Sequence, residues 1–298
     1  MRLDLSILPP QFHVGTSSFS APDWCGNFYP ADLSPHEFLS HYARVFQTVE
    51  IDATWHFMPN AKIAKAWARK VPDGFIFAAK VPKVITHEKL LQGCEDDWRY
   101  FLEAMDHLGP KLGPLLFQFQ YVRKGSEAQE YGTGDGFRRR LEAFLPLMPD
   151  RHRYAIEVRN ATWLRPELTE LLRSRNIALV LVDHARMPRA ASWFESCDPV
   201  TADFSYVRFL GDHHAMDELV AAKREGGEKS RDWDELVIDR SREMREWVPI
   251  LQRLASRVSD VYVYFNNHYA GFAPGSIELL LQVWNDLAGA SEGAGPSP

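Results

Sequence analysis

Cysteine is scarce in this sequence, and nothing groups the few that occur. The three cysteines, Cys25, Cys94 and Cys197, are widely spaced along 298 residues, and there is no Cys-x-x-Cys pair. An odd number of cysteines at such spacing suits neither a disulfide framework nor a structural zinc site. Unpaired thiols are typical of a reducing compartment, so we expect a cytoplasmic protein.

Long apolar runs are also missing. The longest, Ile-Ala-Leu-Val-Leu-Val at 177–182, suits a buried strand and is far shorter than the roughly 20 residues that span a bilayer. The first residues, MRLDLSILPPQF, contain no long apolar region followed by a small-residue cleavage site. We therefore expect no signal peptide, no membrane span and no membrane partner.

Basic residues are not in excess. The chain has 34 Lys and Arg residues against 40 Asp and Glu residues, which gives a formal net charge of −6 at pH 7. Proteins that bind nucleic acid usually carry a basic surplus, so we do not expect a nucleic-acid partner. This balance still leaves room for a local basic pocket that binds a small molecule.

What the sequence does contain is a repeated alternation of short apolar segments and amphipathic stretches. Strands that alternate with helices indicate parallel pairing through right-handed crossovers. Eight such units in under 300 residues predict an α/β fold, a closed (β/α)₈ TIM barrel. The open doubly wound sheet is the alternative, but GTSSFS after the first segment is not a Gly-x-Gly-x-x-Gly turn. The eight predicted strands lie at 12–17, 48–52, 75–80, 114–119, 154–159, 178–183, 205–211 and 261–267.

No linker divides the chain, so we expect a single barrel domain over residues 1–288 and a disordered tail over 289–298. Two long loops are expected, at 122–136 and 211–233. Both follow the carboxyl ends of predicted strands, where barrel enzymes carry their functional residues.

Polar side chains share one face in several predicted strands. Side chains alternate across a strand, so Glu50 lies opposite Val49 and Ile51, and Arg208 lies opposite Val207 and Phe209. The apolar face should pack on the outer helices, and the polar face should then point into the barrel. We therefore expect one set of residues to converge at the carboxyl-end mouth: Glu50, Lys80, Gln118, Glu157, Arg159, Asp183, Arg208 and Asn266.

Seven segments, in this order and at this spacing, resemble the DUF72 family (YecE-like proteins) of uncharacterised TIM barrels. The resemblance covers nearly the whole chain and implies the same barrel, but no settled reaction. Two departures remove histidines from the mouth, because Asn160 and Leu210 stand where the family usually has His. The matching segments are GTSSFSAPDWCGNFYP, FQTVEIDATWHFMP, VPDGFIFAAKVPKVITHEK, LGPLLFQF, YAIEVRNATW, YVRFLG and VYVYFNNHYAGFAPGSIELL.

Carboxylates and a lysine on the inward face are the candidate catalytic groups: Glu157, Glu50, Asp183 and Lys80. A carboxylate can transfer protons if its surroundings tune its pKa. Lys80 ends the third strand, where a Schiff-base lysine could sit, although nearby carboxylates favour a charge-pairing role. The structural alternative for the whole ring is a salt-bridge network that only closes the barrel.

Arg159 and Arg208 are the candidate anion-binding residues, because guanidinium forks match phosphate and carboxylate oxygens. Strand-end amides, aromatic residues after the first strand and a histidine after the third complete the candidate substrate-binding set. The aromatic residues could equally form a packed lid over the mouth. These further residues are Gln118, Asn266, Asn267, Trp24, Tyr29 and His87.

The leading hypothesis is an enzyme, a hydrolase, isomerase or lyase, that acts on a small polar or anionic metabolite at the mouth. A metal-dependent nuclease or repair-type barrel and a non-catalytic ligand-binding barrel are the alternatives. His184, His213 and His214 follow strands six and seven and could join carboxylates around a divalent metal. No His-x-His or His-Glu-x-x-His spacing supports this, so we expect no structural metal and no cofactor.

Overall fold

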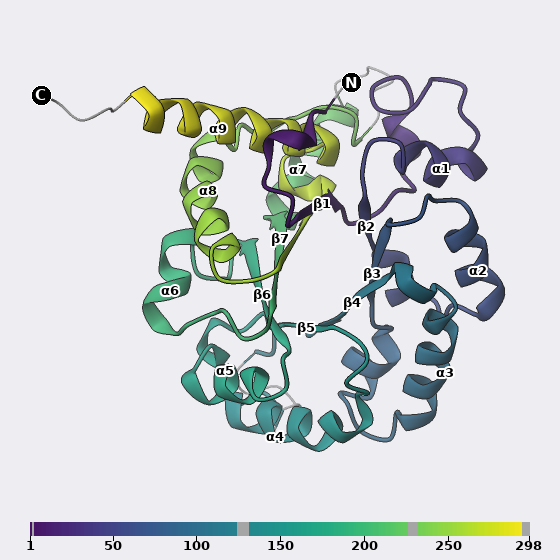
Figure 1. The fold of residues 1–298 in the computed structure, drawn as a ribbon, viewed down its shortest axis with the longest axis vertical. Helices are drawn as coiled ribbons and strands as arrows, with labels where there is room; N and C mark the ends of the chain where they lie inside the picture. Colours follow the sequence, from purple (N-terminus) through teal and green to yellow (C-terminus); the bar gives the residue numbers. More distant parts are fainter. Residues whose placement is uncertain (2, 124–130, 226–231, 294–298) are drawn as a thin grey trace, which may run out of the picture.

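Eight short parallel strands form the centre of the computed structural model, which describes residues 1, 3–123, 131–225 and 232–293 (Figure 1). The strands pair in the order β1-β8-β7-β6-β5-β4-β3-β2, so each lies beside its neighbour in sequence, and β8 returns to β1. This arrangement confirms the predicted TIM barrel. The strands are β1 (Phe12–Thr16), β2 (Thr48–Ile51), β3 (Ile76–Lys80), β4 (Leu112–Gln118), β5 (Tyr154–Glu157), β6 (Ala178–His184), β7 (Phe204–Gly211) and β8 (Asp260–Phe265).

Helices surround the strands, as Figure 1 shows. Their apolar stripes face the barrel, so that Leu251 and Leu254 of the eighth helix are fully buried. The helices are α1 (Phe38–Tyr42), α2 (Ala61–Arg69), α3 (Glu95–Asp106), α4 (Gly134–Phe144), α5 (Pro166–Arg173), α6 (Trp193–Ser196), α7 (His213–Glu225), α8 (Ser241–Ala255) and α9 (Ala273–Gly293).

Two expectations about irregular segments are wrong. Residues 213–225 form α7 rather than a loop, because Met216 and Val220, four residues apart, are both buried on one face of the helix. Residues 289–293 continue α9 and do not belong to a disordered tail. The rest of the predicted tail, 294–298, lies outside the described residues, as do 124–130 and 226–231 of the two predicted loops.

The barrel is closed between β1 and β2 by a tyrosine rather than by a strand ladder. The Tyr42 hydroxyl of α1 accepts a hydrogen bond from the backbone N–H of Thr16 (2.9 Å) and donates one to the backbone oxygen of Thr48 (3.1 Å). A Cβ on Gly15 would lie 2.3 Å from that same Thr48 oxygen. Only glycine therefore allows the two strands to approach so closely.

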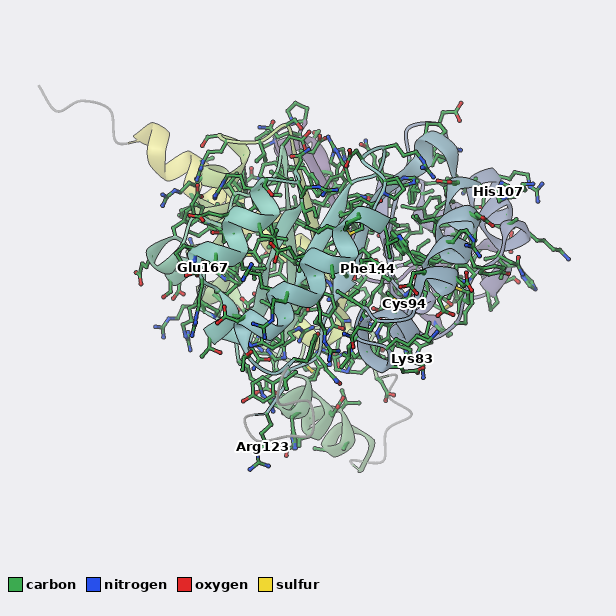
Figure 2. The ribbon with its side chains drawn as sticks, turned by 90° about the horizontal axis from the view of Figure 1, so that it is seen from below. Lys83, Cys94, His107, Arg123, Phe144 and Glu167 are labelled. Carbon is green, nitrogen blue, oxygen red and sulfur yellow. The ribbon has the colours of Figure 1, made fainter. Side chains whose placement is uncertain are left out.

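The strand register decides which side chains point toward the barrel axis. Arg208 of β7 is level with Tyr264 of β8 and Val182 of β6, so these three side chains share the inner face. The carboxyl ends of the strands open at one end of the barrel. α7, pale green in Figure 2, projects from that end, on the same side as Lys83 and Arg123, which follow β3 and β4.

Candidate functional site

A buried arginine between two glutamates forms the floor of the mouth. Arg208 donates one hydrogen bond of 2.6 Å to Glu157 and another of 2.6 Å to Glu50. Tyr206, two residues before Arg208 on the same face of β7, donates a hydrogen bond of 2.6 Å to Glu50. The side chain of Arg208 is 2% exposed and those of both glutamates are 0% exposed. These three predicted residues converge, but they lie below the surface that a ligand could touch.

Arg159 lies above this floor and reaches the solvent. Its Nε donates to Glu157, and its side chain is 15% exposed. In the described part of the chain this is the only hydrogen bond of the Arg159 side chain, so both of its Nη groups remain available. The two guanidinium groups outweigh the effect of burial and hold the pKa of Glu157 at about 2.

The ion pair between Lys80 and Asp52 forms a second part of the mouth. The Lys80 Nζ lies 2.9 Å from Asp52 Oδ1 and 4.9 Å from the centre of the Trp55 ring. Asp52 also lies 3.9 Å from Arg208, and the two cations keep its pKa below the usual range despite burial. The lysine therefore forms an ion pair with a carboxylate and a cation–π contact with an aromatic ring.

Three histidines around the mouth have a lowered pKa. Burial, reinforced by neighbouring positive charge, lowers the pKa of His87, His184 and His213 to about 4 each. The Arg159 guanidinium contributes to all three shifts. The imidazoles are consequently neutral at pH 7.

Hydrogen bonds fix the tautomer of two of these imidazoles. His87 Nδ1 accepts from the indole Nε1 of Trp55 at 3.3 Å, and His184 Nδ1 accepts from the backbone N–H of Arg186 at 3.1 Å. In each ring the proton must then sit on Nε2. Both rings are therefore neutral hydrogen-bond donors at Nε2.

Sequence reasoning missed one histidine of the mouth, His268, which lies in the segment after β8. Its ring stacks on His213 with centres 4.3 Å apart, and its Nε2 lies 3.2 Å from Asp217 of α7. The motif Asn-Asn-His-Tyr drew attention only to its two asparagines. Because α7 was expected to be a loop, nothing in the sequence placed His213 on top of His268.

The amide side chains at the strand ends mostly form hydrogen bonds with the backbone. Gln118 donates to the backbone oxygen of Phe119 at 2.7 Å, and Asn266 accepts from the backbone N–H of His268 at 2.9 Å. Asn267 accepts from Trp24 Nε1 at 3.2 Å and from the first backbone N–H of α9 at 3.0 Å. A cavity of about 240 Å³ beside them is lined by Asp52, Asn266, Asn267 and Trp24, among others.

The aromatic residues after β1 are packed in the interior, and Trp24 also lines the cavity beside Asn267. Trp24 is 1% exposed, and Tyr29 stacks on Phe38 with ring centres 4.4 Å apart. The Tyr29 hydroxyl donates to the backbone oxygen of Phe19 at 2.6 Å. This is the packed-lid alternative, and it leaves Tyr29 no free group for a substrate.

The prediction that Asp183 converges with the other residues at the mouth is wrong. Val182, not Asp183, shares the inner face with Arg208. Asp183 points outward between β6 and α8, where Trp247 Nε1 donates to its Oδ2 at 2.6 Å. β6 is apolar on both faces, so alternation could not show which side chain points inward.

The catalytic roles of Glu50 and Glu157 stay predictions. Neither side chain is exposed, and Glu157, whose pKa is about 2, is a poor proton acceptor near neutral pH. Their hydrogen bonds instead position Arg208 and Arg159.

The fold and this mouth define a TIM-barrel protein with a polar site at the carboxyl ends of its strands. The chain belongs to the DUF72 family, described as a protein of unknown function, whose profile matches residues 13–297. A similar relative is UPF0759 protein YecE of Escherichia coli strain K12, 26% identical over 187 residues, which are 60% of this chain and 62% of YecE. UPF0759 protein YunF of Bacillus subtilis strain 168 is 24% identical over 299 residues, covering 91% of this chain and 94% of YunF.

Solved structures agree with this assignment. The DUF72 protein TM1631 of Thermotoga maritima superposes with a TM-score of 0.69 at 28% identity and covers 92% of this chain and 99% of its own. The DUF72 protein EF0366 of Enterococcus faecalis gives 0.65 at 22% identity over 92% and 95% of the two chains, which supports the fold alone.

The described residues contain neither a metal-binding cluster of side chains nor a membrane-spanning helix. No group of three or more His, Cys, Asp or Glu side chains is arranged to hold a metal ion. No helix there is long and apolar enough to cross a bilayer.

Proposed function

We propose that this protein is an enzyme that binds a small metabolite bearing a phosphate or carboxylate group at the barrel mouth. The observation that carries the proposal is the state of Arg159, which is fixed through Nε by a buried glutamate and keeps both Nη groups available. A guanidinium held in this way loses little entropy when it binds an oxyanion.

Further donors support the anion site. Lys80 is partly exposed beside Asp52, and the Nε2–H groups of His87 and His184 are neutral donors close enough to Arg159 to feel its charge. Oriented donors from several strands at one mouth are typical of TIM-barrel enzymes. Arg208 is not among them, because both of its Nη groups bind carboxylates below the surface.

The charge balance predicts how such an anion binds. The positive charges of Lys80, Arg159 and Arg208 are matched by Glu50, Asp52 and Glu157. The local net charge is therefore zero while the histidines are neutral. A bound anion favours the protonated form of each nearby imidazole and so raises its pKa. Binding should therefore take up protons.

The same imidazoles are the proposed proton-transfer groups. Each is neutral at pH 7, so it can accept a proton from a bound metabolite, and its Nε2–H can polarise a developing oxyanion. This supports hydrolase, isomerase or lyase chemistry in which protons move on an anionic metabolite. Glu50 and Glu157 act as positioning residues in this scheme.

The test compares Arg159→Ala with Arg139→Ala, which removes an exposed arginine on the outer helix α4. Inorganic phosphate, sulfate and small carboxylates are titrated into each protein by calorimetry. Arg159→Ala should weaken anion binding about 10- to 150-fold, the loss expected of a charged hydrogen bond. Arg139→Ala should bind as the wild type does. Equal binding by all three proteins, or no binding by the wild type, would refute the anion site.

Turnover is tested separately, on a panel of phosphate esters and hydroxy acids. We expect activity on at least one of them, reduced in His87→Gln or His184→Gln at unchanged stability. Anion binding without any turnover across the panel would favour a ligand-binding barrel.

A further inference from the structure

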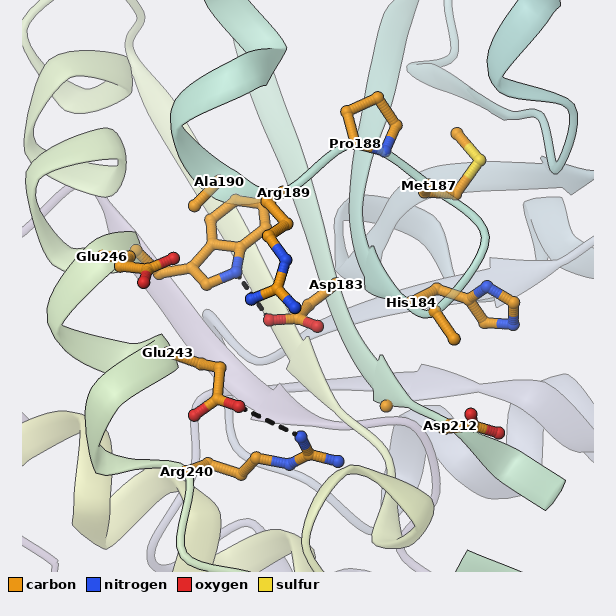
Figure 3. A pocket seen from close by; sticks show the side chains of 13 residues that line it. Asp183, His184, Met187, Pro188, Arg189, Ala190, Asp212, Arg240, Glu243 and Glu246 are labelled. Carbon is orange, nitrogen blue, oxygen red and sulfur yellow. Dashed lines mark hydrogen bonds and ion pairs between the residues drawn. The ribbon is translucent and has the colours of Figure 1, made fainter. Parts of the chain in front are cut away.

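A second cavity, of about 290 Å³, lies outside the strand barrel, between the end of β6 and the helix α8 (Figure 3). It is separated from the mouth by β6 itself, because Asp183 points into the cavity while Val182 points to the barrel axis. Of the mouth residues, His184 at the end of β6 also lines this cavity, whereas Arg159, Lys80 and His87 do not. The cavity therefore needs an explanation apart from the proposed anion site.

The Asp183 carboxyl is poorly satisfied in this cavity. Within the described residues its only hydrogen bond is the one from Trp247 Nε1 to Oδ2, and it forms no ion pair there. An ionised carboxyl can accept about four hydrogen bonds, so most of its capacity is unused. Burial also raises its pKa above the usual range. A side chain left in this condition costs stability, which suggests that it is retained for binding.

Arg189 supplies an opposite charge within the same cavity. Figure 3 shows its guanidinium and the Asp183 carboxyl reaching into the same space. No ion pair or hydrogen bond of the Arg189 side chain occurs in the described part of the chain, so the two charges do not neutralise each other by contact. The other arginine, Arg240, is already engaged by Glu243 at 3.3 Å and by the backbone oxygen of Tyr269 at 3.0 Å.

Part of the remaining wall is apolar, beside the polar side chains His184, Asp212, Arg240, Glu243 and Glu246. Met187, Ala190 and Trp247 all line the cavity. A volume near 300 Å³ lies at the lower end of the range for ligand sites, so the space fits a small molecule and not a nucleotide.

We infer that this cavity binds a free α-amino acid with an aliphatic side chain. Its ammonium group would donate to Asp183, its carboxylate would accept from Arg189, and its side chain would lie on the Met187 wall. An α-amino acid carries the two opposite charges and the apolar group on one carbon. It therefore satisfies both unpaired protein charges at once, which an amine or an acid alone cannot do.

The test uses L-valine and two analogues that each lack one group: isobutylamine, without the carboxylate, and isovalerate, without the ammonium. Calorimetry should show that L-valine binds about 10-fold or more tightly than either analogue, because each analogue leaves one charge unpaired. Asp183→Asn and Arg189→Gln should each weaken L-valine binding by a similar factor, whereas Arg139→Gln and the mouth variant Arg159→Ala should not.

Thermal unfolding of each variant without ligand shows whether weaker binding results from a less stable fold. Asn keeps an acceptor for Trp247 and removes the buried charge, so Asp183→Asn should be as stable as the wild type or more stable. Equal L-valine binding by the wild type and both variants, or no binding by the wild type, would overturn the inference. A clear loss of stability in Asp183→Asn would also overturn the inference, because Asp183 would then stabilise the fold. None of these outcomes bears on the anion site at the mouth.

Discussion

The two ends of the barrel interior both hold charged networks, but they are built in opposite ways. At the amino end of the strands, Asp260 of β8 lies 2.7 Å from His13 Nε2 and 2.9 Å from Arg153 Nη1. Arg153 also donates to the Tyr262 hydroxyl at 3.1 Å, and the His13 ring stacks on Tyr262. Asp260 here contacts both His13 and Arg153, and the Tyr262 ring lies against the His13 ring.

At the carboxyl end, by contrast, the Glu157 carboxylate is buried and the Arg159 cation that it holds extends outward. Glu157 is 0% exposed, whereas Arg159, which it holds, is 15% exposed and has hydrogen-bonding groups to spare. The comparison teaches that inward-facing charge alone does not indicate function. The mouth is distinguished by Arg159, a cation that the buried Glu157 holds through Nε and that is partly exposed to solvent.

The largest effect is expected from Glu157→Gln at the mouth. The change removes one of the two charges that are hydrogen-bonded to the buried Arg208, so the free energy of unfolding should fall by about 3 kcal/mol or more. Urea denaturation at neutral pH measures this loss. A loss no greater than that of an ordinary surface substitution would mean that the floor does not depend on this pair.

If this variant does not fold, the pH dependence of wild-type stability tests the same ion pair. The folded-state pKa of Glu157 is about 2, below its ordinary value of 4.5, so its stabilising contribution is complete above about pH 4.5. It is lost as the pH falls through about 2. Stability that stays constant across this window would contradict the assignment.

A smaller effect is expected from Asp260→Asn at the other end. The Asp260 side chain is 25% exposed, so solvent can replace part of each interaction, and we expect a loss of about 1 kcal/mol. Anion binding at the mouth should not change. Should Asp260→Asn weaken anion binding as much as a mouth variant does, the two ends would not be independent.

The fold and the floor of the mouth could be predicted from the sequence, but the residues at its rim could not. Alternation within TVEI and SYVRF placed Glu50 and Arg208 correctly, because each strand has one apolar and one polar face. The same reasoning had no information for β6, where both faces are apolar, and Asp183 was misplaced. His268 and α7 were missed because their placement depends on contacts between loops far apart in sequence, which periodicity does not report.

We propose that an anion binds beside Arg159 and the neutral histidines, and proton uptake on binding tests this site most directly. The pKa of His87, His184 and His213 is about 4 without ligand, and a bound anion should raise it. Affinity should therefore increase as the pH falls from about 6.5 toward 4, the interval in which a raised histidine pKa changes protonation. Sulfate remains a dianion over this interval, so any proton taken up must come onto the protein.

The measurement is calorimetric titration of sulfate at about pH 5.5 in two buffers with different ionisation enthalpies. The account predicts net proton uptake on binding to the wild type and its loss in Arg159→Ala. Sulfate that binds without proton uptake, or with the same uptake in both proteins, would contradict it.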